Sequence, residues 1–292
     1  MTPWEAVVLW LILALSSGIC DAVTNVITRK LKELDTICLI YPRYLVAFLI
    51  AILLFFFIKI PQIKVDFYYS IFFASCLDVI AISLLIKAIR SAELAKTFPL
   101  VSFTPLFLVL TAFLVLGELP SLIGVIGIIT IVSGTYLLKL EREDKFFEPL
   151  MALVKEKGAR WTLTAALLFS FVGPFLKKAV LSSSVPFTVV VYLILSTIIL
   201  TPFFILSKGN KIEECRKNFI LLAITGISLF LVLLTVNLAF QLALTAYVVS
   251  IKRFSILFTI LLGYYFFKEK GLIKNLTAGM IMVIGAFLVA MG

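Results

Sequence analysis

The segment LGELPSLIGVIGIITIVSGTYLL, residues 116–138, occurs twice in this chain in related form. The segment FKEKGLIKNLTAGMIMVIGAFLV, residues 267–289, aligns with it without a gap at an offset of 151 residues. At the same offset Trp10 falls on Trp161, near the start of each half. A register that holds at both ends of the two halves predicts an internal repeat.

The composition is that of a membrane protein. Of the 292 residues, 62% are hydrophobic and 14% are charged, and there is no His. Soluble domains carry about 25% charged residues, and apolar runs of about 20 residues are typical of membrane-spanning helices. Such runs recur along the chain, whereas a membrane β-barrel has short alternating segments. We therefore predict an all-α integral membrane protein.

Apolar runs bounded by charged residues, Pro or Gly predict ten transmembrane helices. Their approximate bounds are 4–27, 36–58, 67–88, 96–116, 120–138, 161–181, 186–206, 218–240, 243–267 and 272–290. The longest polar stretch, 139–160, is predicted to be an amphipathic linker between the repeats 1–138 and 161–292. Because five spans is an odd number, the second repeat is inserted upside down. We expect two inverted five-helix repeats, an architecture of secondary transporters.

The loop charges predict the orientation of the chain. We name the side of the membrane that holds the first loop side A, and the opposite side is side B. Side A loops carry 19 of the 26 Lys and Arg residues, side B loops carry only Lys59 and Lys64, and five lie within spans. By the positive-inside rule, side A is cytoplasmic and both termini lie outside.

Several function classes find no support in the sequence. The net charge of +10 lies mainly in short loops, which indicates membrane orientation rather than nucleic-acid binding. No nucleotide-binding loop is present, and no paired carboxylates or nucleophile–base motif favours an intramembrane enzyme. The four cysteines are scattered in a chain without His, so no metal site and no cofactor are expected.

The region AELAKTFPLVSFTPLFLVLTAFLVLGELPSLIGVIGIITIVSGTYLL, residues 92–138, has an Ala-rich start, Pro105, the pair Gly117-Glu118 and a Gly-rich final span. Together with ten predicted spans in two repeats, it resembles the EamA-type branch of the drug/metabolite transporter superfamily. The second repeat keeps Glu269 but has Ile256 in place of the proline. The resemblance implies secondary transport of small metabolites, often export, through a cavity between the halves. Ten-span relatives commonly have both termini in the cytoplasm, opposite to the orientation that the loop charges predict.

A narrower resemblance concerns two short segments. GPFLKKAVL, residues 173–181, and SIKRF, residues 250–254, are similar to segments of plastid triose-phosphate translocators. In that branch a lysine of the sixth span and a Lys-Arg pair of the ninth span hold the substrate phosphate. The resemblance implies this role for Lys177 or Lys178, together with Lys252 and Arg253.

Lys252 and Arg253 lie in the middle of the apolar segment AYVVSIKRFSILFTILLGYYFF, residues 246–267. A charge at the centre of a spanning helix costs about 2.5–3.5 kcal/mol, so it normally faces a partner or a cavity. Asp78 lies at matching depth in the third span, and we expect it to neutralise one of the two cations. The other cation is then available to an anionic substrate, with Asp78 as counter-ion of the empty site or as a proton-coupling group. A structural ion pair between two helices is the alternative.

Further polar residues within the spans are candidates for a gate or for the cavity wall. Asp21 and Arg43 lie at similar depth in consecutive spans and are expected to pair with each other, with a substrate or gating role as the alternative. Asn25, one turn beyond Asp21, is expected to line the same opening or to bond a backbone carbonyl. Lys177 and Lys178, near the side B end of the sixth span, reach either the headgroups or the cavity.

Asn237 and Gln241 lie four residues apart on one face of the eighth span and are candidate cavity donors. Pro99 and Pro105 interrupt the fourth span. Proline removes a backbone donor and kinks a helix, which suits a moving gate, although a static kink is equally compatible. Glu118 lies at a span end, where helix capping or loop bonding is expected.

These observations predict a secondary transporter in a prokaryotic inner membrane that moves a small anionic metabolite by alternating access, in export or exchange. The alternatives are a flippase for an anionic lipid-linked sugar and an exporter of neutral or cationic amino acids or drugs. The sequence leaves open whether protons or a counter-substrate drive transport, and whether the protein is a monomer or a homodimer.

Overall fold

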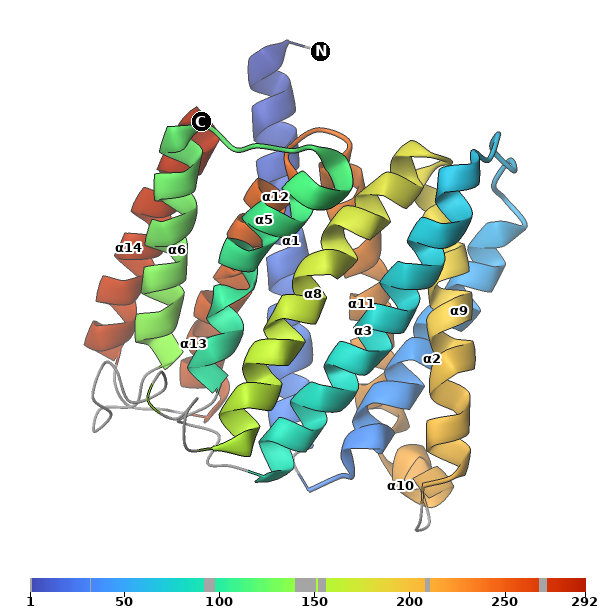
Figure 1. The fold of residues 1–292 in the computed structure, drawn as a ribbon. Coiled ribbons are helices and arrows are strands. Elements are labelled where there is room, and N and C mark those ends of the chain that lie inside the picture. Colours follow the sequence, from blue (N-terminus) through green and yellow to red (C-terminus); the bar gives the residue numbers. More distant parts are fainter. Residues whose placement is uncertain are drawn as a thin grey trace.

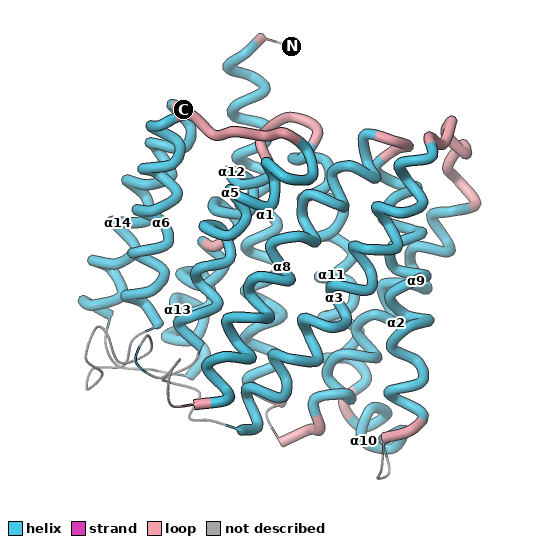
Figure 2. The backbone as a smooth tube through the Cα atoms, in the orientation of Figure 1, coloured by secondary structure: helices cyan, strands magenta, loops and turns pink. Residues whose placement is uncertain are grey.

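A computed structural model describes residues 2–31, 33–91, 98–139, 151, 156–207, 211–267 and 272–292. Long helices run side by side between two ends of the molecule, and both termini lie at the same end (Figure 1). Their bounds are α1 Pro3–Lys30, α2 Thr36–Phe55, α3 Val65–Ser91, η1 Phe98–Phe103, α5 Thr104–Leu116, α6 Leu122–Lys139, α8 Lys157–Leu181, α9 Val185–Ile205, α10 Lys211–Lys217, α11 Phe219–Phe240, α12 Thr245–Lys252, α13 Phe254–Phe267 and α14 Leu272–Met291. No strand occurs within these ranges (Figure 2).

The lengths and apolar surfaces of the helices confirm a multi-pass membrane protein. Within the described ranges, seven helices are long and apolar enough to cross a membrane, and three further apolar helices, Leu100–Leu116, Leu122–Leu137 and Thr277–Met291, are shorter. Large apolar side chains such as Trp4, Phe57 and Phe287 are exposed on the outer surface. Exposed apolar surface on this scale suits contact with lipid rather than water. Most of the predicted linker 139–160 lies outside the described residues, and α8 begins within it at Lys157.

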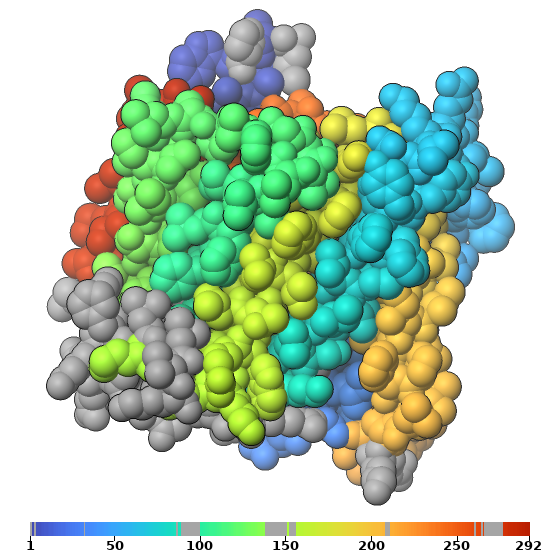
Figure 3. All heavy atoms as spheres, viewed as in Figure 1, coloured from blue at the N-terminus to red at the C-terminus, as the bar shows by residue number. Residues whose placement is uncertain are grey.

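The helix packing repeats itself when the two halves are exchanged. The 151-residue offset relates α1 to α8, α2 to α9, α3 to α11 and α6 to α14. The main contacts obey the same relation: α3 packs against α8 as α11 packs against α1, while α2 packs against α9 and α6 against α14. In the space-filling view, α6, α5, α8 and α3 form one continuous face (Figure 3). This packing is what a two-repeat architecture requires.

Glycines bring α6 and α14 into close contact. A Cβ added at Gly127 would lie 2.8 Å from the carbonyl oxygen of Gly285, and one added at Gly134 would lie 2.8 Å from that of Ala278. At the 151-residue offset Gly127 corresponds to Ala278 and Gly134 to Gly285, so the two contacts are equivalent positions of the two repeats. Small residues that let two backbones approach are a common basis of helix association in membranes.

Two predicted spans are each broken into two helices. In the fourth, η1 ends at Phe103 and α5 begins at Thr104, with Pro105 in its first turn and Pro99 inside η1. Proline suits the first turn because it needs no backbone donor there, so Pro105 starts a helix instead of kinking one. In the ninth, α12 ends at Lys252 and α13 begins at Phe254. The predicted interruption of the fourth span at its prolines is confirmed, and the ninth span keeps its predicted course with a break at Arg253.

The end of α5 positions an acidic side chain. Gly117 has a φ of +71°, in the left-handed region that glycine adopts without steric cost. The amides of Gly117 and Glu118 bond the carbonyls of Phe113 and Ala112, at 2.8 and 3.3 Å. This glycine-terminated helix end turns the chain sharply and places Glu118 against the second half of the molecule.

Candidate functional site

A cavity of about 480 Å³ lies between the two halves. It extends from the middle of the helices toward side A, where Leu31 and Thr36 flank the connection between α1 and α2. Its charged and tyrosine lining residues are Asp21, Arg43, Tyr44, Asp78, Tyr192, Lys252 and Arg253. A polar cavity at this depth among apolar helices is the usual form of a small-molecule site in a transporter.

The break between α12 and α13 lies directly against α1. Arg253 donates its amide to the Ser250 carbonyl at 3.1 Å, and its own carbonyl accepts from Ile256 at 3.0 Å. These bonds span three residues instead of four, so the helix is locally tightened at the two cations. A Cβ added at Gly18 would lie 3.2 Å from the Lys252 carbonyl oxygen. Glycine at this position lets α1 approach the break closely.

Lys252 forms an ion pair with Asp21, the residue almost one turn beyond Gly18. Its Nζ lies 3.0 Å from Asp21 Oδ2, and both side chains are about three-quarters buried. The predicted Asp21–Arg43 pair is therefore wrong. The expectation that Asp78 neutralises Lys252 or Arg253 is also wrong, since among the described residues Asp78 forms no ion pair with either. Depth along a span gives the height of a residue in the membrane, but the approach of α1 to the break decides which acid reaches the lysine.

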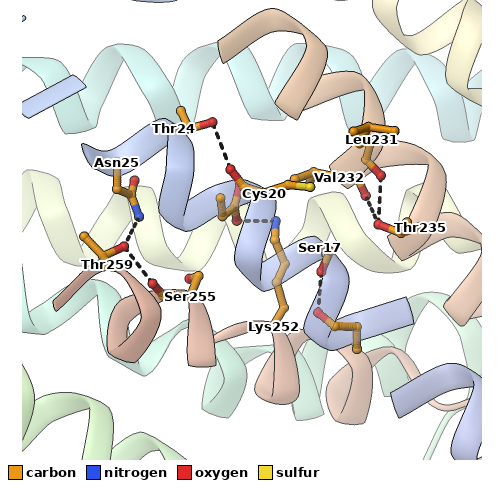
Figure 4. Close-up of polar contacts among 12 residues, drawn as sticks. Ser17, Cys20, Thr24, Asn25, Leu231, Val232, Thr235, Lys252, Ser255 and Thr259 are labelled. Atoms are coloured by element: carbon orange, nitrogen blue, oxygen red, sulfur yellow. Dashed lines mark hydrogen bonds and ion pairs between the residues drawn. The ribbon is translucent and has the colours of Figure 1, made fainter. Parts of the chain in front are cut away.

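A hydrogen bond reinforces the same contact one turn further along α1. Asn25 Nδ2 donates to Thr259 Oγ1 at 3.1 Å, and Thr259 in turn donates to the Ser255 carbonyl at 2.7 Å (Figure 4). Of the two alternatives that the sequence left open for Asn25, the structure has the first: Asn25 lines the cavity, and its amide bonds a side chain of α13 instead of a backbone carbonyl. The ion pair and this bond tie α1 of the first half to the broken span of the second half.

Arg43 and Arg253 are the cavity cations that keep free donors. Within the described parts of the chain neither forms an ion pair, and the Nε atom of each is buried without a hydrogen-bond partner. Among the described residues, the cavity lining holds three cations and two carboxylates, which leaves one positive charge in excess. An uncompensated buried cation is costly unless water or an anion reaches it.

Asp78 is stabilised by hydroxyl groups. Its side chain is buried, with 7% exposure, and its Oδ2 accepts a hydrogen bond from the Tyr44 hydroxyl at 2.6 Å. Tyr192 on α9 lies near the same carboxylate in the cavity wall. Sequence reasoning missed both tyrosines. Tyr44 could have been predicted as a cavity residue because it directly follows Arg43. Tyr192 could not, because it lies in an apolar segment without charged residues.

The side B end of the molecule is closed by a buried ion pair between the halves. Lys177 Nζ lies 2.5 Å from Glu118 Oε1 and 2.6 Å from the Ala243 carbonyl oxygen. Glu118 Oε2 accepts from the amide of Thr245, the first residue of α12, at 2.8 Å. Helix capping by Glu118 is thus confirmed. Lys177 is buried in this pair and does not line the cavity.

Three other predicted site residues also lie outside the cavity. Lys178 faces the outer surface, 3.8 Å from Asp66 Oδ2 and above the ring of Tyr69. Asn237 is fully buried and donates to the carbonyl of Leu233 in its own helix at 2.7 Å. Gln241 caps the end of α11 and is exposed. The charged side chains of the cavity come instead from α1, α2, α3 and the broken ninth span, while η1, α5, α8, α9 and α11 complete its wall.

These features define a multi-pass helical membrane protein of two repeats with a charged cavity between them. The model of the EamA-like transporter family matches residues 8–140 and 156–291, one match in each half, and the chain belongs to this family. It is a family of membrane transporters of small molecules.

A solved structure supports the same fold. A protein whose crystal structure is known has 12% sequence identity to this chain and superimposes with a TM-score of 0.75, over 96% of this chain and 95% of its own. At that identity the likeness concerns the fold alone. Among curated proteins no relative matches the chain.

Proposed function

We propose that this protein is a secondary transporter of a small anionic organic metabolite in a prokaryotic cell membrane, with ten helices that cross the bilayer. Membership of the EamA-like family supports transport of a small molecule. The anionic character rests on a single observation, the excess positive charge of the cavity.

Arg43 and Arg253 would bind the anion. Their guanidinium groups are without ion-pair partners among the described residues, and arginine suits bidentate capture of a carboxylate or phosphate. Lys252 is already neutralised by Asp21, so its main role would be to hold the broken span against α1. The clamp that the sequence assigned to Lys252 and Arg253 is thereby moved to the two arginines.

Alternating access would use the two ends of the cavity. The cavity reaches side A, and the Glu118–Lys177 pair closes side B. In the opposite state this pair would separate while the halves close around the side A mouth, as inverted-repeat carriers do. With side A in the cytoplasm by the loop charges, the described state would accept substrate from the cell interior, which favours export.

The test is uptake into proteoliposomes with a panel of radiolabelled carboxylates, phosphate esters, amino acids and cationic drugs. We expect an anion to be transported, and Arg253→Gln to reduce its transport about 10- to 100-fold, since a charge-assisted hydrogen bond contributes about 1.5–3 kcal/mol. Arg216→Gln is the matched control, because Arg216 is an exposed arginine that pairs only with Glu213 among the described residues. Selection of neutral or cationic compounds, or normal anion transport by Arg43→Gln and Arg253→Gln, would overturn the proposal.

A further inference from the structure

Asp78 is the ionisable cavity residue that the anion site described above does not use. It lies near the middle of α3, is 7% exposed and points its Oδ2 at the Tyr44 hydroxyl. Asp21, the other cavity carboxylate, is paired with Lys252, whereas Asp78 forms no ion pair within the described ranges. A buried carboxylate held only by hydroxyl groups retains its place whether it is ionised or protonated, because a carboxylic acid still accepts a hydrogen bond.

The groups around Asp78 come from α8 and α9, which pack against α3, and from α2 and the ninth span across the cavity. From α2 come Arg43 and Tyr44, and from α9 comes Tyr192. The broken ninth span contributes Lys252 and Arg253 to the same cavity. α8, the closest neighbour of α3, lines the cavity with Phe169, Val172, Gly173 and Leu176, none of which is titratable. The cations whose charges act on an ionised Asp78 are therefore Arg43 and Lys252.

A bound anion changes that balance. Once its negative charge is held by Arg43 and Arg253, an ionised Asp78 faces a second anion in a low-dielectric cavity, and two unit charges of like sign repel strongly there. Tyr44 follows Arg43 on α2, and its hydroxyl donates to the Asp78 carboxylate. One turn of α2 therefore holds Asp78 through Tyr44 and would bind the substrate anion through Arg43. Protonation of Asp78 removes the repulsion without breaking the hydrogen bonds around it.

We infer that Asp78 binds one proton together with each substrate anion, so that the protein is an anion–proton symporter. The proton comes from water at the open side of the cavity and leaves with the anion on the other side. The empty cavity carries one excess positive charge, and the cavity loaded with a monoanion and a proton carries the same charge. The anion alone would leave the cavity neutral, so the uptake of the proton follows from the local repulsion between the anion and Asp78 and not from the net charge of the cavity. This inference rests on the proposed anion transport.

The experiment measures proton uptake on anion binding by the purified full-length protein in weakly buffered detergent solution with a pH-indicator dye. The probes are pyruvate, glycerate and 2-hydroxyethanesulfonate, which remain fully ionised near neutral pH. We expect about one proton per bound anion, and an anion affinity that falls roughly tenfold per pH unit where the proton must be taken from solution.

Asp78→Asn mimics the protonated carboxyl group, so it should bind the anion without proton uptake and with little dependence on pH. Asp66→Asn is the matched control, because Asp66 lies at the exposed start of the same helix, and it should behave as the unmodified protein does. If Asp78→Asn does not fold, infrared difference spectra of the unmodified protein replace it, with a protonated-carboxyl band expected on anion addition.

The outcomes separate this inference from the proposed function. Binding of an anion with neither proton uptake nor a carboxyl band would overturn proton coupling at Asp78 and leave anion transport standing. Proton uptake that persists in Asp78→Asn would overturn the assignment to this residue. Failure of every anion in the panel to bind would overturn the proposed function and the symport together.

Discussion

Replacing Lys177 by methionine should open side B of the protein. Glu118 would lose the ammonium group 2.5 Å from its Oε1 and keep only the Thr245 amide, while its side chain is 11% exposed. Removing one partner of a buried pair costs about 3–5 kcal/mol, because the remaining charge stays buried. In a state with side B open, water would hydrate Glu118, so the cost falls on the closed state alone. The balance between the states should shift by roughly a hundredfold or more toward the open one.

The assay is the labelling rate of a cysteine at the closed end. Thr245→Cys is suitable, because Thr245 is fully buried beside the pair and differs little from cysteine in size. In a background without the four native cysteines, Lys177→Met should increase labelling by a membrane-impermeant maleimide added to side B. Lys178→Met is the control, since that lysine faces outward and should leave the rate unchanged. The double variant Glu118→Gln/Lys177→Met should label more slowly than Lys177→Met, because no buried charge remains unpaired.

Two results would show that the Glu118–Lys177 contact is structural and does not set access from side B. One is the same labelling rate of the cysteine with Lys177→Met as with Lys177 intact. The other is an equally large increase of the rate in Lys178→Met.

Three further predictions concern stability and reactivity. Asp21→Asn should lower the melting temperature in detergent. The double variant Asp21→Asn/Lys252→Gln should lose less stability than the sum of the losses in the two single variants, because each single variant leaves a partly buried group unpaired. Strictly additive losses of stability would mean that the pair is not coupled. Gly127→Leu should abolish folding into the monodisperse protein, since its side chain would meet the Gly285 backbone, and normal purification of this variant would contradict the α6–α14 packing. Burial raises the pKa of the Cys215 thiol in α10, so its alkylation should be slow at neutral pH and accelerate toward alkaline pH, whereas rapid alkylation at neutral pH would contradict its environment.

The sequence predicted the class of fold well because the relevant signals are long-range averages. Hydropathy, the 151-residue offset and loop charges each sum over many residues, and the family match in two halves agrees with them. Helix breaks were harder to predict. Pro105 marked the first break, but the tightened turn at Arg253 has no proline or glycine of its own and lies against Gly18 of α1, a contact that the local sequence does not reveal.

The sequence predicted which charged residues belong to the site, but not which of them form ion pairs with each other. Asp21, Arg43, Asp78, Lys252 and Arg253 were all singled out from the sequence, and all line one cavity. Their partners depend on the rotation of each helix about its own axis, which depth along a span does not give. Lys177 shows the same limit, because its partner Glu118 lies on a loop of the other half that only the tertiary fold brings near.

The most direct test of the anion-binding cavity is the ligand-dependent melting temperature of the purified protein and of the double variant Arg43→Gln/Arg253→Gln. A ligand at a hundred times its dissociation constant stabilises a protein by about 2.7 kcal/mol, enough for a clear rise in melting temperature. The account predicts that at least one small organic anion raises the melting temperature of the unmodified protein in a saturable way and has no such effect on the double variant. Stabilisation by neutral or cationic compounds alone, or an equal rise in the double variant, would contradict it.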